Sequence, residues 1–265
     1  METIDRTLQT VAQPVETTDQ DSLHKLPRPF FSPTLFSRKP SPEAPNYLDT
    51  YYWWAYVEPR GVRFFERDWL INLILCGNYK KLRDCALSTF GAKLPGKTLQ
   101  ITCCYGNLTP RLAERAAAGR GSLDVIDIMP VQLENLSAKL TPMAPAKLQR
   151  MDSRALNYAD GEFDRVLLFF LLHEQPQDSR ERSLQEALRV LKPGGKLVIV
   201  DYGRPKRWHP LRYLLLPFLK FLEPFAVPLW QEELTSLLAR HFRRCVWHKT
   251  AYFGGLYQKI TVTKA

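Results

Sequence analysis

The feature that most constrains the fold is a regular alternation of strand-like and helix-like segments between residues 98 and 202. Strands are expected at 98–104, 123–128, 147–151, 163–171 and 196–202, with helices near 107–118, 130–140 and 179–191. Strands joined through helices form right-handed crossovers and lie parallel in one sheet. The run "RVLLFFLL" is apolar after its first residue, as in a central strand buried on both faces. We therefore predict an α/β fold whose sheet is covered on both sides.

Different segments flank this alternation. Residues 1–45 are rich in Pro, Thr, Ser and Asp, which predicts a disordered leader without a secretory signal. An aromatic segment over 46–92 is expected to form two helices, broken near Gly77-Asn78. The main domain would span 93–265, with a helical insertion near 205–230. Two β-rich runs around a Gly-Gly turn predict an antiparallel C-terminal hairpin at the sheet edge.

Charge and cysteine content narrow the range of partners. The chain has 265 residues, enough for one α/β domain with appendages. A formal net charge of +10 favours an anionic partner such as a membrane surface, nucleic acid or a phosphorylated substrate. The five cysteines show no CxxC spacing, so we expect reduced thiols that serve as small buried side chains.

Polar residues follow three of the expected strands. Ligands of open α/β sheets bind outside the carboxyl ends of the strands. The first end reads "CCYGN", with a single glycine, Gly106, where nucleotide-binding loops usually carry two or three. Asp127 follows the second strand and can accept both hydroxyls of a ribose, while Asp152 and Ser153 follow the third and can meet an adenine edge. Any one of these acids could instead be a helix cap.

The succession of "DVIDI", "MDS", "FDRVLLFFLLHE" and "LRVLKPGGKLVIVD" resembles the class I S-adenosylmethionine (SAM) methyltransferase domain over roughly 95–265. The resemblance implies a Rossmann-like sheet in which Asp127 holds the ribose of SAM and Asp152 and Ser153 the adenine. The full set of expected cofactor-binding residues is Cys104, Tyr105, Gly106, Asn107, Asp127, Ile128, Asp152, Ser153 and Phe170.

Longer strings are similar to the RquA family of rhodoquinone biosynthesis proteins over about 50–230. They are "YYWWAYVEPRGVRFFER", "NYKKLRDCAL", "YGNLTPRLA", "FFLLHEQP", "VDYGRPKRWHPLRYLLLP" and "LEPFAVPLW". This resemblance implies conversion of ubiquinone to rhodoquinone, in which an amino group replaces a ring methoxy group. It further implies that SAM is the amino donor and that a divalent metal, Mn²⁺, assists.

The expected catalytic residues are Tyr105, His173 and Glu174. Tyr105 and Asn107 would reposition the amino acid portion of SAM; alternatively, Tyr105 packs under the following helix and Asn107 caps it. His173 and Glu174 end the fourth strand and suit proton transfer or Mn²⁺ binding, although a histidine here can also be structural. The sequence contains no dense ligand cluster, so the metal ligands stay unassigned.

Aromatic and apolar stretches suggest how a lipid substrate is reached. A quinone ring could stack on side chains of the aromatic segment and the fifth strand end: Tyr52, Trp53, Trp54, Tyr56 and Tyr202. The first four could instead only fasten the first helix to the domain. The stretch His209–Trp230 carries charges and four prolines, which argues against a membrane span. It fits an amphipathic element in the membrane interface, or a helical cap over the sheet.

We therefore expect a cytoplasmic transferase that is peripherally associated with the inner membrane, uses SAM and a divalent metal, and acts on ubiquinone. Its other partner would be an anionic membrane surface and not nucleic acid, because the basic residues flank an apolar stretch instead of lining a groove. Two alternatives stay open: a conventional SAM-dependent methyltransferase of a quinone or other lipid, and a non-catalytic membrane-binding module.

Overall fold

A computed structural model describes residues 44–144, 146–210, 212–214, 223, 225–231, 234–241 and 245–265. The predicted leader, up to residue 43, lies outside the described residues. So do residues 211, 215–222 and 224 of the predicted insertion. The proposed division into domains stays a prediction.

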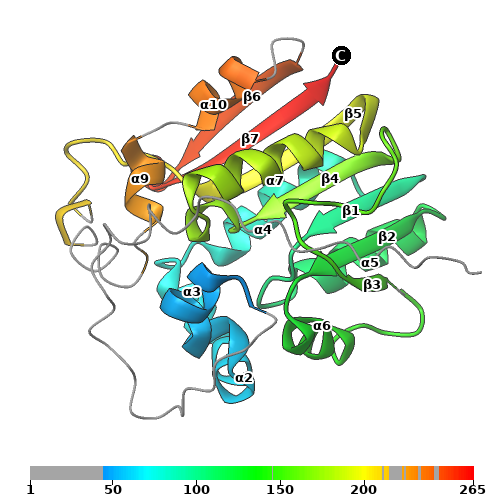
Figure 1. Cartoon of the computed structure of the whole chain (residues 1–265), viewed down its shortest axis with the longest axis horizontal. Coiled ribbons are helices and arrows are strands. Elements are labelled where there is room, and N and C mark those ends of the chain that lie inside the picture. Colours follow the sequence, from blue (N-terminus) through cyan, green and yellow to red (C-terminus); the bar gives the residue numbers. More distant parts are fainter. Residues whose placement is uncertain are drawn as a thin grey trace, which may run out of the picture.

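One seven-stranded sheet runs through the protein, in the order β3-β2-β1-β4-β5-β7-β6 (Figure 1). The strands are β1 (Lys97–Ile101), β2 (Ser122–Asp127), β3 (Lys147–Arg150), β4 (Phe163–Phe169), β5 (Leu191–Tyr202), β6 (Cys245–Tyr252) and β7 (Tyr257–Lys264). The first five are parallel, and β7 pairs antiparallel with β5 and with β6. The predicted parallel sheet and its C-terminal edge hairpin are confirmed.

The helices are η1 (Leu48–Val57, of π type), α2 (Pro59–Phe65), α3 (Asp68–Ile74), α4 (Tyr79–Phe90), α5 (Leu108–Ala118), α6 (Pro130–Ser137), η2 (Leu172–Glu174), α7 (Gln177–Arg189), α9 (Ala226–Gln231), α10 (Leu234–His241) and η3 (Phe253–Gly255). In Figure 1, α7 crosses in front of the sheet and α4 lies behind it. The central strand β4 is buried from Val166 to Leu168, as its apolar sequence predicted.

The prediction of two helices before the sheet was wrong, because this region contains four helical segments. The break near Gly77-Asn78 is present between α3 and α4. The additional breaks have local causes. Glu58 is extended ahead of Pro59, and its carboxylate accepts a hydrogen bond from the amide of Gly61 at 2.8 Å, so a new helix starts there. Arg67 is also extended and separates α2 from α3.

The predicted interfacial stretch His209–Trp230 divides into two parts within the described residues. Near its start, Tyr213 and Leu214 are exposed. Near its end, Phe225, Ala226, Leu229 and Trp230 are buried. The latter part therefore packs onto the protein and is unavailable to a membrane. No helix in the described ranges is long and apolar enough to cross a bilayer.

Arg180 of α7 fastens this end of the sheet together. Its buried guanidinium donates to the carbonyls of Leu172, Gln175 and Phe225 at 2.9–3.1 Å. Burial lowers the pKa of Arg180 to about 10, so the group stays charged at neutral pH.

Replacing Arg180 with methionine should lower the unfolding free energy by about 3 kcal/mol, because three buried carbonyls lose a charged donor. Denaturant unfolding measures the change. Arg182→Met, on the exposed side of the same helix, is the matched control and should change stability by no more than about 0.5 kcal/mol. Equal effects of the two substitutions would contradict this role for Arg180.

Candidate active site

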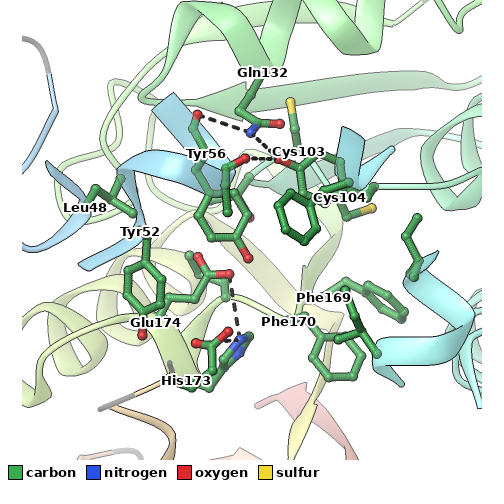
Figure 2. Close-up of a pocket in the computed structure, with 18 of the residues that line it drawn as sticks. Leu48, Tyr52, Tyr56, Cys103, Cys104, Gln132, Phe169, Phe170, His173 and Glu174 are labelled. Carbon is green, nitrogen blue, oxygen red and sulfur yellow. Dashed lines mark hydrogen bonds and ion pairs between the residues drawn. The ribbon is translucent and has the colours of Figure 1, made fainter. Parts of the chain in front are cut away.

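A cavity of about 740 Å³ lies at the carboxyl ends of the parallel strands. Its walls come from the ends of β1, β2, β4 and β5 and from η1 and α3, which lie far apart in the sequence. Figure 2 shows Tyr52 and Tyr56 of η1 opposite Phe169 and Phe170 at the end of β4, with His173 and Glu174 between them. The segment before the sheet therefore closes over the strand ends.

Most of the predicted site residues line this one cavity. These are Tyr52, Trp54, Tyr56, Cys104, Tyr105, Asp127, Ile128, Asp152, Ser153, Phe170, His173, Glu174 and Tyr202. Trp53, Gly106 and Asn107 do not line it. Trp53 is buried within the protein, and Gly106 and Asn107 take part in contacts behind the loop. The ligand-binding roles of all these residues stay predictions.

Asp127 ends β2 and joins two loops of the site. One carboxylate oxygen accepts the amide of Cys103 at 2.8 Å, and the other accepts the amide of Met129 at 2.9 Å. Burial raises the pKa of Asp127 to about 6, although these amide hydrogen bonds favour the ionised form. Each oxygen can accept a further hydrogen bond, so the carboxylate can still receive the hydroxyls of a ribose.

Asp152 and Ser153 follow β3 and are held mainly by neighbouring side chains. Arg154 contacts both oxygens of Asp152, with its Nη2 2.8 Å from Oδ2. The hydroxyl of Ser153 lies 2.8 Å from that of Ser183 and accepts a hydrogen bond from Gln175 at 3.0 Å. A hydroxyl has one donor and two lone pairs, so these two contacts leave Ser153 one further hydrogen-bonding position for a ligand.

The polar backbone groups of the loop from Cys103 to Asn107 are largely paired within the protein. The amide of Gly106 donates to Glu66 at 2.9 Å. Lys139, which forms a 2.9 Å ion pair with Glu66, donates to the carbonyls of Cys104 and Gly106 at 3.4 and 3.1 Å. Gly106 has a φ of +78°, and a Cβ there would lie 2.3 Å from the hydroxyl of Tyr79. The single glycine is thus required by a close side chain of the protein itself.

Tyr105 connects the loop to η1. Its hydroxyl donates to the carbonyl of Ala55 and accepts from Gln132 at 3.0 Å. Its ring stacks on Tyr56 with centroids 5.9 Å apart and an interplanar angle of 8°. Gln132 also donates to the carbonyl of Tyr56 at 3.3 Å, as Figure 2 shows. Tyr105 therefore packs mainly against η1 and not beneath α5.

Asn107 occupies the N-cap position of α5 but makes no capping hydrogen bond with its side chain. The side-chain oxygen instead accepts from Arg83 of α4 at 2.7 Å. The alternative that Asn107 caps the helix was therefore wrong: the arginine of a neighbouring helix competes for the oxygen that a cap would use.

His173 is the centre of a buried acidic cluster. Its Nδ1 lies 2.9 Å from Asp201, while its Nε2 faces Glu174 at 3.7 Å and Glu223 at 3.9 Å. Burial alone would lower the pKa of His173, but Asp201 and the other two carboxylates outweigh it and raise the pKa to about 9. Burial raises the pKa of Glu174 to about 8, which His173 partly opposes. At neutral pH the pair therefore holds exchangeable protons beside the cavity.

The remaining wall of the cavity is aromatic. The ring of Phe170 makes edge contacts with His173 and Tyr202, with centroids 5.8 and 5.6 Å apart. Burial raises the pKa of Tyr56 well above its usual range, so its hydroxyl stays protonated. These side chains form an apolar chamber with few hydrogen-bonding groups, which suits a flat ring with an apolar tail.

The described residues provide no preformed metal site, because no group of three His, Cys, Asp or Glu side chains is arranged to hold an ion. The described residues therefore assign no ligands to the expected divalent metal. All five cysteines are free thiols, but each is only partly buried, so the expectation that they serve as small buried side chains was wrong.

Sequence reasoning missed several residues that shape the site, namely Glu66, Tyr79, Gln132, Lys139 and Glu223. Asp201 also shapes the site, and its place at the end of the fifth strand is a signal that the sequence offers. The others come from helices and loops far from the strand ends. Their sequence context carries no pattern that would single them out.

Part of the sheet-forming region is similar to known proteins. Residues 98–195 match the family profile described as "Methyltransferase domain". A demethylmenaquinone methyltransferase of Staphylococcus aureus (strain MRSA252) is 31% identical over 138 residues, covering 52% of this chain and 56% of the relative. The chain thus spans about half the length of the curated relatives it matches.

Two solved structures share the fold at low sequence identity. A SAM-dependent methyltransferase from Aquifex aeolicus is 16% identical with a TM-score of 0.52, over 77% of this chain and 97% of that one. A putative SAM-dependent methyltransferase from Methanococcus maripaludis is 17% identical with a TM-score of 0.52, over 78% and 93%. The predicted Rossmann-like methyltransferase fold is confirmed.

Gly106→Ala should destabilise the protein by about 2 kcal/mol more than Gly77→Ala, as measured by denaturant unfolding. The two glycines have nearly equal φ values, +78° and +77°, so both substitutions carry the same backbone strain, about 1 kcal/mol. Only at Gly106 does the added Cβ meet another side chain, that of Tyr79. Equal losses would show that Tyr79 gives way without cost.

The pH dependence of stability should change in Glu174→Gln. Since the folded pKa of Glu174 is raised from 4.5 to about 8, the folded state binds this proton more tightly than the unfolded state. Its stabilising contribution is present below about pH 4.5 and is lost as the pH rises to about 8. Unfolding free energies of the wild type, relative to the variant, should therefore fall across this window, by up to about 1.4 kcal/mol per pH unit. A constant difference would contradict the raised pKa.

Proposed function

We propose that the chain is a SAM-dependent transferase that converts ubiquinone to rhodoquinone, in keeping with the match of residues 98–195 to a methyltransferase domain. An amino group would replace a ring methoxy group, with SAM as the amino donor. The observation that carries the proposal is the pairing of the loop after β1. Its carbonyls at Cys104 and Gly106 accept from Lys139, and its amide at Gly106 donates to Glu66.

This pairing would affect the protonation state of the amino group of SAM. Backbone carbonyls are the groups that could bind an ammonium and keep it protonated. Of Cys104 and Gly106, only Cys104 lines the cavity, and because its carbonyl already accepts from Lys139, it is a poor partner for a second cation. An ammonium group that does not donate hydrogen bonds to backbone carbonyls loses a proton more readily, and the resulting amine can act as a nucleophile. SAM, when bound, supplies that nitrogen.

His173 and Glu174 supply the acid–base groups that this exchange requires. Amination of the methoxy-bearing ring carbon needs a proton taken from the nitrogen and one given to the departing methanol. The transfer is completed when the bond between the nitrogen and the α carbon of SAM breaks with loss of a proton from the neighbouring carbon, so that the remnant leaves as an alkene and the nitrogen, now on the ring, takes up a proton. His173 and Glu174 lie together at the cavity wall, and the pKa values of about 9 and 8 place both titrations near the working range. Asp201 would hold the imidazole in place through Nδ1.

The chamber supports a quinone as the substrate. Aromatic rings of Tyr56, Phe170 and Tyr202 line it, and a quinone ring can stack or pack edge-on against them. The matched relative from Staphylococcus aureus is named for a quinone substrate, demethylmenaquinone. The ligands of a divalent metal stay unassigned, because no set of three was found among the described residues.

The relative's name also favours a second candidate function, methyl transfer from SAM to a quinone ring. This reaction would use the same cavity, with Glu174 or His173 accepting the proton released from the ring. A non-catalytic membrane-binding module is less well supported, because a buried acid–base pair beside an apolar cavity would serve no purpose in it.

Product mass spectrometry with SAM labelled with nitrogen-15 in its amino group separates these functions. The purified protein is incubated with ubiquinone, Mn²⁺ and the labelled SAM. We expect a nitrogen-15 aminoquinone and methanol. A methylated quinone without label would establish the second function instead, and no quinone product at all would contradict both.

Glu174→Gln should slow formation of the product by about 10²-fold or more, with SAM binding retained. Glu114→Gln is the matched control because Glu114 is exposed on α5, away from the cavity. Wild-type turnover in Glu174→Gln would exclude the proposed proton transfer through this carboxyl.

A further inference from the structure

Two short segments expose large apolar side chains at the same end of the protein. On α3, Trp69 and Leu73 are 58% and 66% exposed, and Ile74 is exposed beside them. After β5, Trp208 and Leu214 are 71% and 69% exposed, together with Tyr213. We call these six residues the apolar rim. Exposed side chains of this size gathered in one place mark a binding surface, unlike single apolar residues scattered over a protein.

The apolar rim borders the mouth of the cavity. Leu73 and Ile74 of α3 line the cavity from one side, and Leu214 lines it from the other. On its buried face, α3 packs through Ile71 and the following Leu75 into the core. The helix is therefore anchored with its remaining apolar side chains directed outward, so the surface is continuous with the interior where the reaction would occur.

Cationic side chains flank both halves of the rim. Arg63 and Arg67 are exposed before α3, and the Arg67 guanidinium lies 5.1 Å from the ring centre of Phe64. Lys206 and Arg207 are exposed beside Trp208, with the Lys206 ammonium 5.7 Å from its ring centre. Asp68 is an exposed acid at the start of α3, but the formal charge of the chain is +10. Apolar and aromatic side chains edged by Lys and Arg match the interface of an anionic bilayer.

We propose that the apolar rim docks on an anionic phospholipid bilayer and that a lipid substrate passes from the bilayer into the cavity between α3 and Leu214. Trp69 and Trp208 enter the interface, and the flanking Arg and Lys side chains contact the headgroups. This assigns a membrane role to α3, which the sequence did not indicate. It deepens the proposed function, because only a lipid substrate needs such a route.

Co-sedimentation with vesicles tests the docking independently of turnover. The full chain is mixed with vesicles of phosphatidylcholine alone or with about 30% phosphatidylglycerol. We expect binding about tenfold stronger to the anionic vesicles. The double variant Trp69→Gln/Trp208→Gln should lose about tenfold or more of that binding. The matched control, Met143→Gln/Val246→Gln, changes two exposed apolar residues that are not in the rim and should bind like the wild type.

Thermal unfolding checks that both double variants are folded. Unchanged vesicle binding in Trp69→Gln/Trp208→Gln, or none in the wild type, would overturn the proposal. A wild-type dimer that this double variant dissociates would assign the rim to a second copy and overturn it as well. Vesicle binding that depends on the rim supports the docking surface even if no quinone is converted, in which case only the proposed function fails.

Discussion

The site depends on the carboxylate of Asp201, which is buried at the end of β5. It accepts the amide of Leu172 at 2.8 Å and the amide of Tyr202 at 2.7 Å, and it pairs with Nδ1 of His173 at 2.9 Å. One side chain thus fixes the turn after β4, the end of β5 and the orientation of the imidazole. A buried carboxylate is stable only when so paired, so the cluster forms as a unit or not at all. The other imidazole nitrogen is thereby directed toward Glu174 and Glu223.

The loop after β1 shows how a common fold can keep one half of a binding site and change the other. At the end of β2, Asp127 lines the cavity and retains acceptor capacity. In the loop, by contrast, the amide of Gly106 donates to Glu66 and its carbonyl accepts from Lys139, the partner of Glu66 in an ion pair. Both partners come from helices or turns packed behind the loop, so their position rigidifies its shape.

The sequence was informative where local periodicity or strand position determines the structure. The β4 run was placed correctly because a strand buried on both faces has to be apolar. The pairing of Glu66 with Lys139 could not be predicted, because it joins residues 73 positions apart through packing of α6 and the turn after α2. Glu223 is an acid in an apolar and proline-rich stretch, so its sequence context predicts a surface residue. In the structure its carboxylate instead faces His173. Asn107 shows the opposite error, since Arg83 overrode a reliable local capping preference.

The segment formed by η1 and α3 links the route of the substrate to the side chains that line the cavity. Because η1 and α3 precede the sheet in sequence but close over its strand ends, the same stretch supplies the aromatic wall at Tyr52 and the rim at Leu73. If the chamber opened to water, a hydrophobic tail would first have to be transferred from the bilayer into water, at a cost in free energy. Opening toward a bilayer removes this cost, because the tail stays in an apolar medium throughout. The raised pKa of Glu174 has the same origin, since the surroundings that favour a quinone ring also disfavour a carboxylate charge.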